Sequence, residues 1–523
     1  MKKLYLVFLL TIAPFMPTKA QHILVPEETG RIYHSDSLFV APKKPLLAAG
    51  EVLATNTFVW AFNKTILNAD YAQLSWQSIK TNLTSKPVWD GDKFSTNLFA
   101  HPYHGSLYFN AARSNGLSFW QSSPFALGGS LMWEYFGENE LPSINDLFTT
   151  TIGGICLGEI TFRLSDLLID NTSWGAERFF REFFVACISP IRGVNRLLNA
   201  RSWKVERTKG RELPDVPLYL NFFAGGRFLS EYDRIKSGET SIHLGMNMIY
   251  GEPLRDSRGS YYTPYEWFTL NVGMDLFSKQ PLFSQVNATG ILWGKNLDNS
   301  DTYSVTIGVF QHFDFYDSQI GKKNGEKFSP YKISEAAAFG IGGLFVRHGS
   351  FRNKPLEFRS ATYLNGIALG GNTTDFYSFD NRDYNLGSGF SIKLYTGATH
   401  NKRWSYDVSA EHFYLYTWHN TAQDYIRNSQ GDAGHSHLTV ISPFITYHSG
   451  KKWNIVLRNR HFIRSTYYKY HDDVRFSTND VILTIGYTLR FLRFIILSLL
   501  LRILKFRTFA DTTQKEHRYG IGI

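Results

Sequence analysis

The sequence predicts an α+β protein in which an N-terminal helical domain precedes a C-terminal antiparallel transmembrane β-barrel of about twelve strands. Apolar residues follow a helical spacing up to residue 210 and alternate with polar residues after it. Aromatic residues make up 16% of the chain and glycine contributes 42 residues, yet the mean hydropathy is only −0.22. In a transmembrane barrel, apolar lipid-facing and polar inward-facing residues alternate along each strand, so their hydropathies cancel on averaging.

Residues 1–20 have the parts of an export signal peptide. Lys2 and Lys3 form a basic start, residues 4–15 are apolar, and Ala20 stands at the position that a signal peptidase recognises. The apolar run is shorter than the roughly 20 residues that a spanning helix needs. We therefore expect cleavage after Ala20 rather than an anchor helix.

The remaining chain divides by composition into three parts. We predict a helical domain over residues 21–210 and the barrel over residues 211–491. Residues 492–523 form an atypical tail, with an apolar run followed by a basic stretch, after the expected last strand. The tail has two interpretations, an interfacial helix or the product of a shifted reading frame or a lost stop codon.

Six segments of the first part have the apolar spacing of helices. Ser122 and Ser123 are candidate N-caps before Pro124, and Ser143 is a candidate N-cap for the following helix. The basic segment 193–210 is interpreted as a linker, with a solvated helix as the alternative. The predicted helices are 51–67, 71–83, 94–112, 124–138, 143–169 and 174–188.

Twelve segments of the second part alternate between apolar and polar residues, and their spacers are rich in Gly, Asn, Asp and Ser. In the last segment, Leu483 and Ile485 share one face while Thr484 lies on the other. The predicted strands are 218–229, 239–250, 264–277, 282–294, 301–315, 333–347, 355–370, 385–397, 402–418, 437–449, 452–468 and 478–491.

A barrel built from these strands has to close. In hydrocarbon every backbone N–H and C=O must be paired within the protein, so a spanning sheet has no free edge. A soluble β-sandwich also alternates, but it turns its apolar faces inward and has fewer aromatic residues at strand ends. Together with the export signal, this predicts an outer-membrane barrel, with the helical domain on the periplasmic side or within the barrel.

Residues 89–163 hold the densest group of unusual polar residues, beginning with Trp-Asp-Gly-Asp at 89–92. Four motifs follow: His-Pro-Tyr-x-Gly from 101, Ala-Arg-Ser-Asn-Gly from 112, Trp-Glu-Tyr-x-x-Glu from 133 and Pro-Ser-Ile-Asn-Asp from 142. In these motifs the sequence resembles the DUF3943 family of uncharacterised bacterial proteins. The resemblance implies membership of that family and no mechanism, because the family's function is unknown.

We expect the polar residues of these motifs to form a buried network that holds the helices together. The alternative is a divalent metal site, because His101 and His104 share one helix face and Glu134 and Glu138 share another. Asp146 could also complete the helix start after Ser143. The candidate residues are His101, His104, Arg113, Glu134, Glu138, Asn145, Asp146 and Glu159.

A second polar group is expected inside the barrel. Three arginines share one face of a late strand, and charged residues of two earlier strands face the same lumen. They are interpreted as a ladder of salt bridges that stiffens the wall, with an anion-selective or headgroup-binding lumen as the alternative. These residues are Lys393, Asp407, Glu411, Arg458, Arg460 and Arg464.

The sequence lacks the common motifs for nucleophilic catalysis, zinc proteolysis and phosphate binding. We therefore favour a non-enzymatic outer-membrane protein that is structural or that binds or passes a lipid or small ligand, with the helices closing or plugging the barrel. The alternative is a membrane-embedded hydrolase of phospholipid or lipopolysaccharide. Outer-membrane lipid is the expected partner, nucleic acid is not expected despite the net charge of +10, and no cofactor is expected.

Overall fold

The computed structural model describes residues 38–232, 234–252, 261–300, 302–319, 322–323, 326–327, 329–377, 382–417 and 431–491. The predicted signal peptide and the tail from residue 492 lie outside these residues. Close packing divides the described chain into two compact units. The smaller unit comprises residues 38–41 and 164–214, and the larger comprises residues 42–163 and 215–491. The predicted helical domain is thus shared between the two units.

The first part of the chain is helical, as predicted. Among the described residues, no helix has both the length and the apolar content needed to cross a bilayer. The helices are α2 (Pro45–Thr65), α3 (Trp76–Thr84), α4 (His101–Ser114), α5 (Phe119–Phe136), α6 (Ile144–Phe148), α7 (Gly154–Leu168), α8 (Gly175–Ile188) and α9 (Pro190–Leu198). The short 3-10 turn η1 (Asp70–Ala72) and the π-helical turns η2 (Thr96–Ala100) and η3 (Thr149–Gly153) lie between them.

Two helix boundaries correct the sequence prediction. Helix α5 begins at Phe119, because Ser118 accepts a hydrogen bond from the backbone N–H of Gln121 at 3.3 Å and forms a capping box. Pro124 therefore lies inside α5 and not in its first turn. Helix α9 occupies the start of the predicted 193–210 linker, because Pro190 is tolerated in a first helical turn. Ser143, by contrast, caps α6 as predicted, accepting from the N–H of Asp146 at 3.2 Å.

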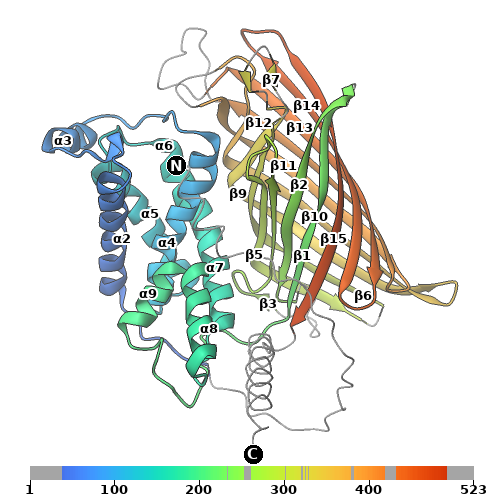
Figure 1. The fold of residues 1–523 in the computed structure, drawn as a ribbon, viewed down its shortest axis with the longest axis horizontal. Helices are drawn as coiled ribbons and strands as arrows, with labels where there is room; N and C mark the ends of the chain where they lie inside the picture. The colour runs from blue at the N-terminus through green and yellow to red at the C-terminus, as the bar shows by residue number, and fades with distance from the viewer. Residues whose placement is uncertain are drawn as a thin grey trace, which may run out of the picture. The chain divides into compact units, whose positions relative to one another are not determined.

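Twelve long strands form the barrel (Figure 1), each within a few residues of its predicted position. They are β1 (Leu218–Glu231), β2 (Arg234–Tyr250), β4 (Phe268–Leu276), β5 (Phe283–Asn299), β6 (Tyr303–Asp317), β9 (Lys332–Phe351), β10 (Lys354–Thr373), β11 (Tyr384–His400), β12 (Trp404–Thr417), β13 (Gly434–Ser449), β14 (Trp453–Tyr468) and β15 (Val474–Phe491). The short β3 (Tyr261–Tyr262) pairs with β5, and β7 (Lys322–Lys323) pairs with β8 (Glu326–Lys327).

The ring of long strands is closed and antiparallel. The first and last strands pair along their length, with Leu220 opposite Leu489. The pairing of β5 with β6 completes the ring, so none of the twelve strands has a free edge. Side chains alternate across the wall as predicted. Leu483 and Ile485 lie on the outer face and are 54% and 58% exposed, whereas Thr484 lies on the inner face and is 5% exposed.

The lumen is filled by side chains that meet from opposite walls. Arg460 on β14 donates to Gln285 on β5 at 2.5 Å, and Tyr316 on β6 donates to Glu411 on β12 at 3.1 Å. Neither pair of strands is adjacent in the sheet, so both contacts cross the lumen. Apolar side chains pack beside them: Leu229, Tyr316, Tyr331, Ile333, Ala338, Ile367, Phe413, Leu415, Leu438, Val440 and Phe462.

Helical segments of the larger unit pack against the outside of the strand wall. On β6, Gln311 and Phe315 alternate with the lumen residue Tyr316, so they point outward. Phe315 nevertheless is 1% exposed, because its ring packs against Phe94 with centroids 5.1 Å apart. Gln311 donates to the backbone oxygen of Ile152 in η3 at 2.9 Å. These helical segments therefore contact the outer face of the strand wall.

We expect Asp480→Asn to destabilise the barrel by about 3 kcal/mol, because it leaves buried positive charge without its counter-ion. Asp480 is fully buried and accepts from Arg227 Nε at 2.9 Å and from Arg460 Nε at 2.9 Å. The measurement is the urea midpoint of the folded band on unheated gels. Asp472→Asn, in the exposed turn before β15, is the matched control and should keep the wild-type midpoint. Equal midpoints for both variants would contradict this prediction.

Candidate functional site

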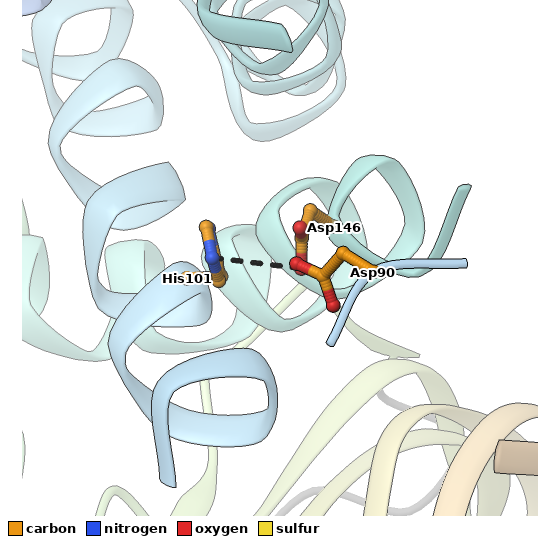
Figure 2. Close-up of side chains that lie close together, drawn as sticks. All are labelled: Asp90, His101 and Asp146. Atoms are coloured by element: carbon orange, nitrogen blue, oxygen red, sulfur yellow. Dashed lines mark ion pairs between the residues drawn. The ribbon is translucent and has the colours of Figure 1, made fainter. Parts of the chain in front are cut away.

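Three segments of the larger unit bring together Asp90, His101 and Asp146, which we call the Asp90 cluster (Figure 2). Asp90 lies in the loop after α3, His101 is the first residue of α4, and Asp146 lies in α6. A parallel bridge between Val88 and Ser143 holds the loop beside the start of α6. His101 follows directly on the π-helical turn η2, a type of distortion that often occurs at functional sites.

The three side chains converge on one point. His101 Nε2 lies 3.5 Å from Asp146 Oδ1, and one ligand atom from each residue lies within 4.8 Å of the others. A further carboxylate, on Asp92, is 3.9 Å from His101 Nε2 and is half exposed. Among the described residues, no other group of three or more His, Cys, Asp or Glu side chains converges in this way.

Amide side chains hold the two carboxyl groups of the Asp90 cluster in place. Asp90 Oδ1 accepts from Asn97 Nδ2 at 2.5 Å and from Asn145 Nδ2 at 3.0 Å. Asn145 Nδ2 also lies 3.0 Å from Asp146 Oδ1, and Asn145 Oδ1 accepts from the backbone N–H of Asp90 at 3.1 Å. Asn145 therefore connects the loop to α6 through both its amide atoms.

The two carboxyl groups of the cluster differ in their affinity for a proton. Burial, together with the negative charges of Asp90 and Glu134, raises the pKa of Asp146 well above its usual value. Burial alone would also raise the pKa of Asp90, but hydrogen bonding from Asp146 and the charge of His101 hold it below its usual value. The Asp146 carboxyl group therefore holds a proton more tightly than the Asp90 carboxyl group does.

His101 and Glu134 complete the electrostatics of the site. Burial would lower the pKa of His101, but the Asp92 carboxylate and the negative charge of Asp90 raise it instead. Burial raises the pKa of Glu134 to about 8, although the charge of His101 and a hydrogen bond act against this rise. That bond runs from the backbone N–H of Ser143 to Glu134 Oε2 at 2.7 Å. The shifted pKa values of His101 and Glu134 thus arise from burial and from the charges of neighbouring residues.

The barrel contributes two further contacts to the site. Arg382 Nη1 donates to the backbone oxygen of Asp90 at 2.6 Å. The hydroxyl of Tyr384, on β11, accepts from Asn97 Nδ2 at 2.7 Å and donates to the backbone oxygen of Asp92 at 3.1 Å. The loop that carries Asp90 is thus fixed from the barrel side as well as from α6.

The six charged residues predicted for the lumen do point inward, but their partners are residues that the sequence did not single out. Lys393 binds Asp314 and Glu335, the latter at 2.7 Å. Arg460 binds Asp480 at 2.5 Å, Arg464 binds Asp375 at 2.6 Å, and Asp407 binds Arg359 at 2.7 Å. Glu411 accepts from Tyr316 and Tyr395, and the Arg458 guanidinium lies 4.1 Å from the Phe444 ring centre. Four of the six residues thus form ion pairs, whereas the contacts named for Glu411 and Arg458 are with tyrosine hydroxyls and an aromatic ring.

A comparison with known families identifies one part of this chain. Residues 86–191 match the family model DUF3943, a domain of unknown function. The chain contains a DUF3943 domain. The matched segment includes the whole Asp90 cluster, and the resemblance inferred from the four motifs is confirmed. No curated protein matches the chain.

Several solved barrel structures are similar to about half of this chain. The NanC porin is 10% identical over 51% of this chain and 100% of that chain, with a TM-score of 0.23. The transport unit of the autotransporter AIDA-I from Escherichia coli is 9% identical over 52% and 89%, with a TM-score of 0.23. OprD from Pseudomonas aeruginosa is 10% identical over 53% and 94%, with a TM-score of 0.18.

The other candidate residues of the DUF3943 domain lie in separate contacts. Arg113 Nε binds Glu159 Oε2 at 2.7 Å, and Arg163 Nε binds the other oxygen of Glu159 at 2.8 Å. His104 contacts Tyr108, with Nε2 2.8 Å from the hydroxyl, and burial with the charge of His101 lowers its pKa to about 3. The predicted metal set of His101, His104, Glu134 and Glu138 does not converge on one point among the described residues. Of these four, only His101 belongs to the Asp90 cluster.

We expect the stability of the DUF3943 domain to fall as pH rises from about 4.5 to 8. In this window the folded state keeps a proton on Glu134 that the unfolded state has lost, because the folded pKa is about 8. Glu134→Gln imitates the protonated form and should flatten the dependence of Tm on pH. Glu140→Gln, in the exposed loop after α5, should keep the wild-type slope. A slope unchanged in Glu134→Gln would show that another group carries the dependence.

Proposed function

We propose that this chain is a non-enzymatic outer-membrane protein that binds membrane lipid through the outer faces of its helices, with a sealed barrel as its anchor. The observation that carries this proposal is that several helices bury their polar residues and expose their apolar ones. Helices of water-soluble domains have the opposite arrangement. An apolar face turned outward matches an environment of lipid.

Helix α2 is a clear example of this inverted arrangement. It exposes Leu46 and Phe58, which are 88% and 71% exposed, and buries Thr55 and Asn56 against the other helices. The amide of Asn56 donates to the backbone oxygen of Gly129 in α5 at 3.1 Å. The polar groups of α2 are therefore satisfied inside the bundle, while large apolar side chains face outward.

Helix α5 repeats the arrangement within the same unit. Its buried residues include Ser122, Ser130 and Glu134, and its outward side carries large apolar side chains. A surface that exposes several such groups in one region marks a site of contact with another molecule or with a membrane. The exposed residues are Trp120, Leu127, Leu131 and Phe136.

The smaller unit shows the inversion in its strongest form, because its helices bury arginines and expose phenylalanines and leucines. Arg192 binds Asp166 at 2.7 Å and Arg196 binds Glu182 at 2.7 Å, so the buried charges are compensated within the unit. The exposed apolar residues of α8 and α9 are Phe179, Phe180, Phe183, Val194, Leu197 and Leu198.

The barrel supports an anchoring role more than one in transport. Its outward side chains are apolar around the ring, as a lipid-facing wall requires. Its lumen is crossed by hydrogen bonds and packed rings, as at Tyr331 and Phe462, whose centroids are 3.8 Å apart. A solute has no evident path between such groups in the described part of the lumen. Binding therefore fits the geometry better than passage.

We expect NBD attached at Phe58→Cys, Leu131→Cys or Phe183→Cys to contact acyl chains, because each side chain lies on an exposed apolar face. Each variant is made in a Cys156→Ala, Cys187→Ser background and reconstituted as the full chain into vesicles. Quenching of NBD by lipids with brominated acyl chains is measured. The control, NBD at Asp472→Cys in an exposed turn, should be quenched little. If the three helix positions are quenched no more than the control, the helices do not bind lipid.

A further inference from the structure

We propose that Asp90, His101 and Asp146 bind a divalent transition-metal cation, with Zn²⁺ as the best match. One imidazole and two carboxylates are ligands that zinc takes in proteins. This inference does not depend on lipid binding, since it concerns a buried site and not an outer face. The three ligands come from a loop and two helices, so the cation would join three separate segments.

The spacing of the side chains fits a coordination sphere. Two ligand atoms bound to Zn²⁺ at about 2.1 Å and separated by a tetrahedral angle lie about 3.4 Å apart. His101 Nε2 and Asp146 Oδ1 are 3.5 Å apart. In Figure 2 the imidazole of His101 faces the carboxyl groups of Asp90 and Asp146 across one small space. Small side-chain rotations would bring the third ligand from its present distance, within 4.8 Å, to the same sphere.

The charge of the ligand set also fits. Two carboxylates and a neutral imidazole together carry two negative charges. These cancel the two positive charges of a divalent cation. An occupied site would therefore be electrically neutral inside a largely buried region, where an uncompensated charge is costly. Asp146 is 2% exposed, so neutrality matters most at this carboxyl group.

An unpartnered oxygen beside Asp90 is an independent sign of a missing ligand. Asn97 is fully buried, and its Nδ2 lies 2.5 Å from Asp90 Oδ1. Its Oδ1 has no hydrogen-bond partner in the described structure. Buried polar atoms are rarely left unsatisfied. A half-turn of the Asn97 amide would break the hydrogen bonds of Nδ2 to Asp90 and Tyr384 and would present Oδ1 to a bound cation as a fourth ligand.

The groups around the cluster resemble a second coordination shell. Asn145 contacts both carboxyl groups, and Arg382 and Tyr384 donate to the backbone oxygens of Asp90 and Asp92. Such partners orient metal ligands and strengthen binding. A bound cation would therefore add to the connections between the loop, α4 and α6 and would raise the thermal stability of the full chain.

The test uses the full chain in detergent, stripped with chelator, reloaded with Zn²⁺ and desalted. We expect about one Zn²⁺ per chain by elemental analysis and a higher Tm on loading. His101→Gln and Asp146→Asn should each lose the metal and the rise in Tm. The matched control is His104→Gln, which changes a buried histidine three residues further along α4 that contacts Tyr108. The His104→Gln variant should keep both the metal and the rise in Tm.

If a variant of a metal ligand fails to fold, a second experiment on the wild-type protein still tests the proposal. Co²⁺ added to the stripped chain should give the visible absorption of a protein-bound ion, which Zn²⁺ should then abolish. Retention of Zn²⁺ well below one per chain in wild type, or no visible Co²⁺ absorption, would overturn the proposal. Equal metal content in wild type and a folded His101→Gln variant would also overturn it, because the metal would then lie elsewhere.

Discussion

Closure of the strand ring is the constraint on which the rest of this structure depends. The pairing of β1 with β15 and of β5 with β6 leaves no free backbone edge in the ring, which a sheet surrounded by hydrocarbon cannot tolerate. Closure also confines the inward side chains to a narrow cylinder, where charges have to be neutralised in place. Asp480 between Arg227 and Arg460, and Lys393 against Asp314 and Glu335, are the result. The same filling leaves the outside of the wall as the place where the helical segments contact the barrel.

The sequence was sufficient to locate the strands, because alternation of apolar and polar residues is a local property with a period of two. The last strand was predicted at 478–491 and lies at 474–491. The start of α5 was predicted after Ser122 and Ser123, whereas Ser118 caps the helix, because a capping serine is recognised with certainty only from its hydrogen bond. The contact of helical segments with the outer wall could not be predicted. It depends on outward residues such as Phe315, which in sequence look the same as lipid-facing ones.

The sequence predicted the region of the chain that holds the candidate site but not the set of residues that form it. His101 and Asp146 were candidate site residues, whereas Asp90 and Asn97 were only noted within the polar segment, since proximity across a loop leaves no periodic pattern in the sequence. The pairing of His101 with His104 was wrong because residues three apart on a helix still differ in direction by about 60°. That difference turns His104 towards Tyr108 and Trp133 and away from the carboxyl groups. Arg382 and Tyr384 come from far along the chain and could be recognised only from the fold.

The contacts between the DUF3943 domain and β11 have a consequence for the order of assembly. The oxygen of Asp90 receives its hydrogen bond from Arg382, 292 residues later, and Asn97 meets Tyr384 287 residues later. During synthesis the domain therefore exists before its partners do. The rings of Phe94 and Phe99 likewise have no strand residue to pack against until the barrel forms. The domain reaches its final state only once the barrel has folded. A chaperone that shields these groups before then would bind the unfinished chain and be released from the folded one.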